Sequence, residues 1–245
     1  MTFAPDLFVG RTVLVTGGTS GIGEACARAF AALGATVLAT GATEAERERA
    51  SGVDENAGIR FATLDVRSPE AVTACLAGFE RLDVLVNAAG VIRRDAEHDP
   101  AVFTDVIDIN LNGVMRVATA AKSLLSGSGG SVVNLASMLT FFGGPRVPAY
   151  SASKGGIGQL TKSLAAAWAS DGIRVNAVAP GWIATPLTQA LQEDEVRSAP
   201  IMARTPMGRW GAPAEVADCT VFLASPAARF VTGAILAVDG GYLTI

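Results

Sequence analysis

The stretch Thr16-Gly17-Gly18-Thr19-Ser20-Gly21-Ile22-Gly23 decides the fold, because it joins a short apolar run to a helical pattern. The apolar run at residues 12–15 predicts a buried strand, and the alanine-rich pattern at 22–33 predicts a helix. Glycine permits a turn with positive φ and lets backbone N–H groups approach a phosphate, and the helix start adds partial positive charge. Although its spacing differs from G-x-G-x-x-G, the stretch predicts a turn that binds a dinucleotide.

The same alternation of strand and helix continues along the 245 residues. The apolar runs are apolar on both faces, which is typical of a parallel sheet covered by helices on each side. We therefore expect a single α/β domain over residues 1–245. It would be a Rossmann-type doubly wound sheet of seven strands, with its ligand crevice at their carboxyl ends. The remaining predicted strands are 36–39, 60–64, 84–86, 132–135, 174–179 and 235–238.

Residues 185–213 interrupt this alternation just after the sixth predicted strand. Thr185-Pro186 is typical of a helix start, and further prolines and glycines punctuate the segment. An insertion at this place would overhang the crevice, so we interpret it as a small substrate lid. A static pair of surface helices is the alternative.

Composition excludes several classes of function. A formal net charge of −4, without a basic block, argues against nucleic acid or an acidic membrane as the main partner. No apolar run approaches the roughly 20 residues of a membrane helix, and residues 1–10 hold no apolar signal region. Cys26, Cys75 and Cys219 show no paired spacing, as expected for reduced thiols in a cytoplasmic protein. His98 is the only histidine, so neither a histidine-based triad nor a metal site is expected.

Tyr150 and Lys154 lie four residues apart, and Ser137 lies thirteen residues before Tyr150. Positions i and i+4 share one face of a helix. An ammonium about 4 Å from a phenol favours the phenolate, so we expect the pKa of Tyr150 to fall toward neutrality. A serine hydroxyl beside the phenol would steady a carbonyl oxygen. Together with the glycine turn, this pattern predicts hydride transfer to or from a carbonyl, and an ordinary exposed pair is the alternative.

Further motifs accompany these residues: Asp65-Val66, Asn87-Ala88-Ala89-Gly90, Asn110 and Pro180-Gly181. In order and spacing the full set resembles the short-chain dehydrogenase/reductase family, and it covers nearly the whole chain. The resemblance implies that Tyr150 acts as acid and base and that Ser137 holds the substrate oxygen. It also implies that Lys154 bonds to the nicotinamide ribose and that Asn110 bends its helix and holds a water. Ala88 stands where the family often has a second asparagine.

The resemblance also implies a coenzyme site. Asp65 would accept a hydrogen bond from adenine, and Ile183 and Thr185 would hold the carboxamide; Asp65 could instead only cap a turn, and Asn87 only satisfy the sheet. Gly41 provides no carboxylate to bind the ribose 2′-hydroxyl, which favours NADP over NAD without excluding either. The implied coenzyme-binding residues are Gly17, Thr19, Ser20, Gly21, Ile22, Gly23, Thr40, Asp65, Val66, Asn87, Ala88, Ala89, Gly90, Tyr150, Lys154, Pro180, Gly181, Ile183 and Thr185.

Longer stretches resemble the branch of the family that contains 2-deoxy-D-gluconate and 2-dehydro-3-deoxy-D-gluconate dehydrogenases. These stretches are 90–94, 136–139, 144–148 and 208–211. The resemblance implies a small sugar-acid or keto-acid substrate, and guanidinium groups suit its carboxylate. Besides Ser137 and Tyr150, the candidate substrate residues are Arg94, Arg146 and Trp182. A 3-oxoacyl thioester reductase or a broad ketone reductase is the alternative, and a silent nucleotide sensor would lack Tyr150 or Lys154.

Small residues crowd the segment after Tyr150, at Ser151, Ala152, Ser153, Gly155, Gly156 and Gly158. They would allow another helix to approach closely, and glycines in a helix otherwise lower its stability. The resemblance implies a dimer built from such helices, usually doubled to a tetramer. The apolar C-terminal tail supports this expectation, because it would be unfavourable on a monomer surface. We therefore expect a homotetramer.

Overall fold

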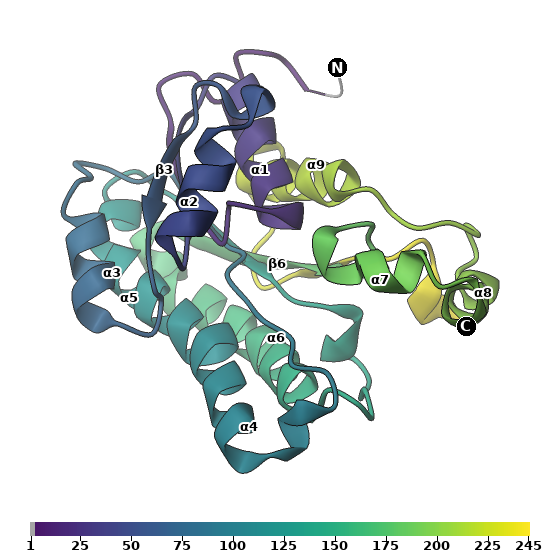
Figure 1. Ribbon diagram of the computed structural model, residues 1–245. Coiled ribbons are helices and arrows are strands. Elements are labelled where there is room, and N and C mark those ends of the chain that lie inside the picture. The colour runs from purple at the N-terminus through teal and green to yellow at the C-terminus, as the bar shows by residue number, and fades with distance from the viewer. Residues whose placement is uncertain (1–2) are drawn as a thin grey trace.

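Seven parallel strands form one sheet in the computed structural model, which describes residues 3–245 (Figure 1). Their order is β3-β2-β1-β4-β5-β6-β7, so the predicted doubly wound fold is confirmed. Each predicted strand is present, and no strand end differs from its prediction by more than two residues. The strands are β1 (Thr12–Thr16), β2 (Thr36–Gly41), β3 (Arg60–Thr63), β4 (Val84–Asn87), β5 (Ser131–Leu135), β6 (Arg174–Pro180) and β7 (Ile235–Val238).

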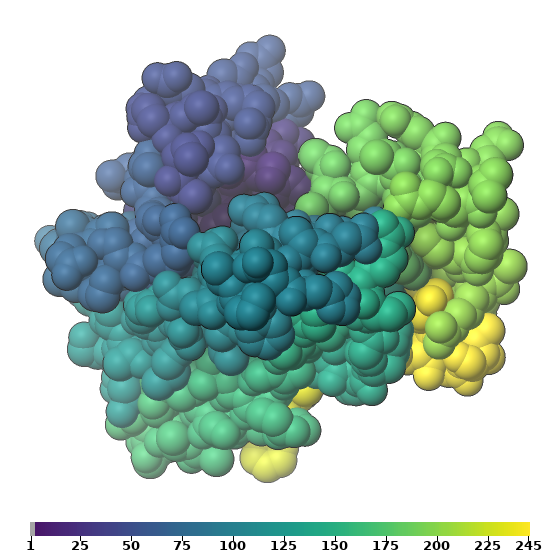
Figure 2. All heavy atoms as spheres, turned by 60° about the horizontal axis from the view of Figure 1, so that its bottom comes forward, coloured from purple at the N-terminus to yellow at the C-terminus, as the bar shows by residue number. Residues whose placement is uncertain are grey.

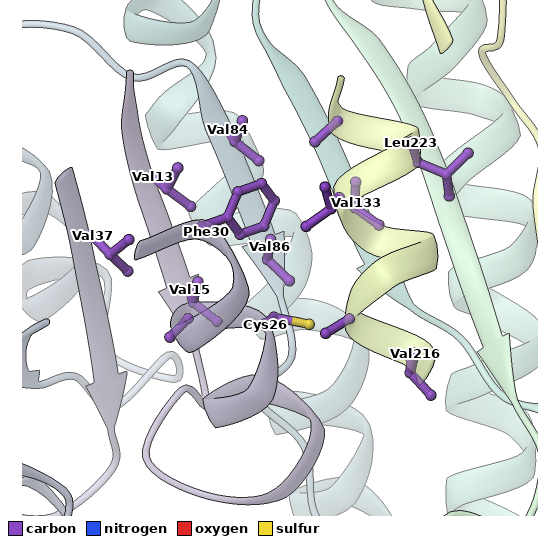
Figure 3. Packing of buried hydrophobic residues seen from close by; sticks show 14 of the residues in the cluster. Val13, Val15, Cys26, Phe30, Val37, Val84, Val86, Val133, Val216 and Leu223 are labelled. Carbon is purple, nitrogen blue, oxygen red and sulfur yellow. The ribbon is translucent and has the colours of Figure 1, made fainter. Parts of the chain in front are cut away.

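Helices cover both faces of the sheet, as the apolar strands require (Figure 1). Cys26 and Phe30 of α1 and Val216 of α9 pack with strand valines on one face (Figure 3). A second buried cluster joins α3, α5 and α6 to the opposite face. The helices are α1 (Gly21–Ala32), α2 (Glu44–Ser51), α3 (Pro69–Leu76), α4 (Pro100–Ile107), α5 (Gly113–Ser126), α6 (Pro148–Trp168), α7 (Gln189–Gln192), α8 (Glu195–Arg204) and α9 (Pro213–Ala224).

The order in which successive strands are added to the sheet reverses between β1 and β4. The chain runs from β1 through β2 to β3 on one side, and from β4 to β7 on the other. Ligands of doubly wound sheets bind outside the carboxyl ends of the strands at such a switch point. The turns that follow β1, β4, β5 and β6 therefore meet where a ligand site is expected.

A π-helical turn at Asp108–Asn112 links α4 to α5 and contains the buried Asn110. A π turn inserts an extra residue into a helix and often marks a functional position. The change in helix geometry therefore falls at the predicted residue.

The segment 185–213 forms a short 3₁₀ turn, η6 (Pro186–Thr188), followed by α7 and α8. Pro186 occupies the first turn position, as predicted, whereas Pro200 lies inside α8 rather than ending a helix. In Figure 2 this light green segment stands beside the body of the molecule, with the yellow C-terminal residues against it. Within residues 3–245, no helix combines the length and apolarity needed to cross a membrane.

Candidate active site

A cavity of about 860 Å³ lies at the carboxyl ends of the strands. Its wall is built by the turn after β1, the segments after β4 and β5, the start of α6, and the segment after β6. The structure thus brings together residues that are more than 160 positions apart in the sequence. The predicted site residues that line it are Gly17, Thr19, Ser20, Gly21, Ile22, Gly23, Asp65, Val66, Ala88, Ala89, Gly90, Arg94, Ser137, Arg146, Tyr150, Lys154, Pro180, Gly181, Trp182, Ile183 and Thr185.

Three predicted site residues lie behind this wall rather than in it. The Thr40 side chain is buried within β2, outside the cavity wall, and its hydroxyl has no hydrogen-bond partner among the described residues. Asn87 donates to the Asn134 side chain at 2.9 Å, and Asn134 donates to Thr161 at 2.9 Å, which ties β4 through β5 to α6. The amide nitrogen of Asn87 thus serves the sheet, as in the alternative considered for it, while its Oδ1 atom is buried without a hydrogen-bond partner among the described residues. Asn110 bonds the backbone of Val91 through both amide atoms, at 2.8 and 2.9 Å, and so holds the segment after β4.

The turn after β1 leaves no space for a side chain at Gly17. A Cβ placed there would lie 2.6 Å from the Ala89 backbone, and the residue has φ +65°. Gly21 also has a positive φ, of 56°, where α1 begins. The Ser20 side chain makes no capping hydrogen bond, so the first N–H groups of α1 stay available to an anion. These features fit the pyrophosphate of a dinucleotide.

A carboxylate that the sequence analysis missed lies at the far end of the cavity. Glu46 accepts hydrogen bonds from the backbone N–H groups of Ala42 at 2.7 Å and Thr43 at 3.3 Å. A side chain at Gly41 would contact Glu46 and Thr19. The capping-box pattern Thr-x-x-Glu at 43–46 was the signal that could have placed this carboxylate. Gly41 itself has no carboxylate, as expected, but the carboxylate of Glu46 from α2 lies beside it.

Asp65 lies at the same end of the cavity, on the turn after β3. Its carboxylate accepts from the Arg67 backbone at 2.9 Å and pairs with the Arg67 side chain. Hydrogen bonds from Arg67 lower the pKa of Asp65, so the carboxylate is charged at neutral pH. Asp65 does stabilise its own turn, and it still lines the cavity where adenine is expected.

Tyr150 and Lys154 lie on one face of α6, as their spacing predicts. The Lys154 Nζ atom is 5.4 Å from the centre of the Tyr150 ring and donates to the Leu135 carbonyl at 2.6 Å. Ser137 follows β5 and accepts from the Leu139 backbone at 3.1 Å. Its hydroxyl acts on the Tyr150 phenol in the direction that lowers the pKa of that group. A phenol, a hydroxyl and an amine thus meet at one point of the cavity wall.

The expected fall in the pKa of Tyr150 is wrong for the protein without coenzyme. Burial removes the phenol from water and raises its pKa, and this effect exceeds the opposing hydrogen bond from Ser137. Burial also lowers the pKa of Lys154 from 10.5 to about 8, because a buried ammonium loses its hydration. The spacing of Tyr150 and Lys154 predicts that the amine lies beside the phenol, but it does not reveal that both groups are buried, and burial disfavours the charged form of each. At neutral pH the phenol therefore keeps its proton.

Arginine side chains crowd the substrate end of the cavity, and they differ in their partners. Arg146 forms an ion pair with Asp95 through two nitrogens. Arg94 has no carboxylate within salt-bridge distance among the described residues, and burial lowers the pKa of its guanidinium. Arg204 of α8 lies 4.3 Å from the Tyr242 ring and has no carboxylate partner in residues 3–245 either. Of the two predicted arginines, Arg94 is the one whose charge is not already paired.

The apolar part of this end comes from aromatic side chains. The rings of Trp182 and Trp210 meet edge to face with centres 5.8 Å apart. Phe142 stacks on Tyr242 at 6.1 Å. Both rings line the cavity; Tyr242 was not among the predicted substrate residues, since the C-terminal turn reaches the site only through the fold.

Known proteins resemble the chain over its full length. The family profile described as enoyl-(acyl carrier protein) reductase matches residues 17–243. The 2-dehydro-3-deoxy-D-gluconate 5-dehydrogenase of Bacillus subtilis is 42% identical, over 96% of this chain and 95% of its own length. An Agrobacterium tumefaciens protein solved with bound NADP is 40% identical with a TM-score of 0.88, covering 99% of this chain and 100% of that one.

A gluconate 5-dehydrogenase from Burkholderia cenocepacia, solved with NADP and tartrate, is 35% identical with a TM-score of 0.89. That comparison covers 99% of this chain and all of the other. Sequence, fold and cavity thus agree with the resemblance found in the motifs. The chain belongs to the short-chain dehydrogenase/reductase family.

Proposed function

We propose that the protein is an NAD(P)-dependent oxidoreductase that interconverts a secondary alcohol and a carbonyl on a small sugar acid or keto acid. The observation that carries this proposal is the meeting of Tyr150, Lys154 and Ser137 in the cavity that the glycine turn opens. The named activities of the relatives from Bacillus subtilis and Burkholderia cenocepacia support it.

Tyr150 moves the proton. Its raised pKa keeps the phenol protonated at neutral pH, which suits it to give a proton to a carbonyl oxygen during reduction. The hydroxyl of Ser137 donates to the same oxygen and stabilises the developing negative charge. When bound, the coenzyme supplies or accepts the hydride. Oxidation requires the phenolate, which the Lys154 ammonium stabilises in its charged form.

Lys154 and Asn110 complete the proposed catalytic set. Lys154 is held at the Leu135 carbonyl, close to where a nicotinamide ribose would lie under this proposal. Both amide atoms of Asn110 bond the Val91 backbone, and the side chain does not line the cavity. We therefore propose that Asn110 acts by holding this segment and a water behind Lys154. Removing Asn110 should therefore disturb proton delivery rather than coenzyme binding.

The substrate carboxylate binds Arg94, and Arg204 of α8 lines the same cavity. A partly buried guanidinium without a carboxylate partner is costly unless an anion arrives, and this applies to Arg94, whereas Arg204 is exposed. Arg146 is already neutralised by Asp95, and we propose that it shapes the loop rather than binding substrate. Trp182 forms part of the apolar wall. The tartrate in the Burkholderia structure, a hydroxy acid, is of the chemical class that this arrangement suits.

We propose that NADP is preferred to NAD, although both bind. Gly41 presents no carboxylate of its own, and NADP is bound in the Agrobacterium and Burkholderia structures. Glu46 opposes this preference, because its carboxylate repels a 2′-phosphate and occupies the N–H groups of Ala42 and Thr43. The preference is therefore small.

Residues 185–213 are proposed to act as a lid over the substrate, since Thr185, Leu191 and Arg204 from this segment line the cavity.

We also propose a homotetramer in the cytoplasm. The exposed Phe103 of α4 and Phe230 near β7 would be covered in an assembly. Gly156 and Gly158, however, leave room for Leu111 and Thr140 of the same chain, so they give less support to a helix-pair interface than the sequence suggested. Light scattering that reports a monomer would reject the tetramer.

A reductase of 3-oxoacyl thioesters or of broad ketones is the second candidate, favoured by Phe142, Tyr242 and Trp182 in the wall. A turnover screen with NADP and NAD separates the two, using keto sugar acids, acyl thioesters and aryl ketones. Turnover of the free acids without turnover of thioesters supports the proposed function. Turnover confined to thioesters or aryl ketones would reject it.

A further inference from the structure

A buried carboxylate outside the catalytic set connects two parts of the site. Glu97 is 1% exposed. One of its oxygens accepts from the backbone N–H of Arg93 at 2.8 Å, and the other accepts from the backbone N–H of Tyr150 at 2.8 Å. It forms no salt bridge with any residue in the described range 3–245. Burying a charge is costly unless hydrogen bonds compensate, so a buried carboxylate with two short backbone bonds indicates a specific role.

The bond to Tyr150 replaces a missing helix cap. Val147 precedes α6 and makes no side-chain cap, and Pro148 at the first position has no N–H. Glu97 comes from η2 (Ala96–His98) and caps α6 from a segment fifty-three residues away in sequence. A negative charge at this place is also favoured by the helix dipole. The first turn of the helix that carries Tyr150 is therefore capped by a side chain from another segment.

The bond to Arg93 fastens the loop 93–98, which carries Arg94 into the cavity. Other contacts join this loop to the residues just before α6: the Asp95 N–H donates to the Arg146 carbonyl at 2.8 Å, and the His98 ring lies 3.1 Å from the Pro145 carbonyl. Asp95 has φ 67°, the only positive φ of a non-glycine residue in the described chain. These contacts hold the loop in a conformation that it would not adopt alone.

We propose that Glu97 is a positioning residue that fixes the substrate arginine loop against the catalytic tyrosine by bonding the backbone of both. The inference rests on the proposed function, since it assigns Arg94 to the substrate and Tyr150 to the proton. The charge of Glu97 from η2 raises the pKa of the phenol, Ser137 lowers it, and the Lys154 Nζ atom of α6 lies 5.4 Å from the centre of the ring. Glu97 thus affects both the place and the acidity of the phenol.

Glu97→Gln tests the proposal, because glutamine keeps the shape but has only one acceptor for two N–H groups. Misplacing a reacting group by about 1 Å costs on the order of 100-fold in rate, so we expect kcat to fall about 10- to 100-fold, with coenzyme affinity unchanged. Removing the negative charge should lower the pKa of Tyr150, so the acidic limb of the oxidation profile, where the phenolate gains its proton, should move to lower pH. Wild-type kcat and an unshifted profile in a folded variant would overturn the proposal.

Asp99→Ala is the matched control. Asp99 lies two residues further along the same segment and accepts from two backbone N–H groups at the start of α4, without touching Tyr150. We expect it to unfold at a lower urea concentration, as for a lost cap, with the pH profile unchanged. If Asp99→Ala shifts the profile as much as Glu97→Gln, the effect is structural and the proposal fails.

A measurement without turnover separates this proposal from the proposed function. The chain has two tyrosines, so in a Tyr242→Phe background the ultraviolet titration of the phenolate reports Tyr150 alone. Glu97→Gln should lower that pKa and should speed hydrogen exchange at the Tyr150 amide. Should glutamine prevent folding, Glu97→Asp keeps the charge but shortens its reach, and it should speed the exchange with little change in the titration. If neither quantity changes, Glu97 does not position Tyr150, whatever the substrate is.

Discussion

Arg94→Gln should weaken the reaction of an acidic substrate far more than Arg146→Gln. Arg94 lines the cavity without a carboxylate partner in the described chain, whereas Asp95 already binds Arg146. A hydrogen bond to a charged group contributes about 1.5–3 kcal/mol. Since each 1.4 kcal/mol is a factor of about ten, loss of Arg94 should lower kcat/KM about 10- to 140-fold.

The assay compares kcat/KM of both variants for a keto sugar acid and for its neutral amide. Arg94→Gln should lose activity with the acid and keep most of it with the amide, because only the acid has the charge that Arg94 binds. Arg146→Gln should affect both substrates alike, through the loop that Asp95 and Arg146 join. Equal losses for acid and amide in Arg94→Gln, or an acid-selective loss in Arg146→Gln, would refute the reasoning.

Three further predictions concern coenzyme binding and stability. Gly17→Ala should abolish coenzyme binding in a fluorescence titration, because its Cβ would lie 2.6 Å from the Ala89 backbone, whereas Gly10→Ala, with φ +73° and no atom within 4 Å, should strain the fold and leave binding intact. Glu46→Gln should raise the affinity for NADP relative to NAD in the same titration, and an unchanged ratio would remove Glu46 from coenzyme selection. Lys154→Met should abolish turnover yet stabilise the coenzyme-free protein at pH 7 by up to about 3 kcal/mol, since burial lowers the pKa of Lys154 from 10.5 to about 8. At Lys154 the unfolded chain binds more protons between those values, so the stability of the wild type relative to the variant should rise from pH 8 to 10.5 by urea unfolding.

Most of the fold follows from local sequence patterns. Apolar runs with helical patterns between them predict each strand, because residues buried on both faces leave a continuous apolar signal. The spacing of Tyr150 and Lys154 likewise predicts that they share a face of α6, which depends only on helix geometry.

The errors arose where the outcome depends on tertiary contacts. Glu46 folds back onto the turn after β2, and Asp95 neutralises Arg146 from a loop 51 positions away. The side chain of Thr40 is buried in the sheet, which the position after a predicted strand end did not reveal. The direction of the Tyr150 pKa shift was wrong because burial, which the sequence does not give, exceeds the effect of a nearby charge.

Tyr150→Phe tests the central claim most directly, measured as coenzyme binding together with the single-turnover rate of hydride transfer. Phenylalanine keeps the ring that lies beside Lys154 and removes only the hydroxyl. We expect coenzyme affinity to stay at the wild-type value and the rate to fall about 100- to 10,000-fold, the usual contribution of a positioned acid or base. A variant that transfers hydride at a rate near that of the wild type would contradict the assignment of Tyr150 as the proton donor.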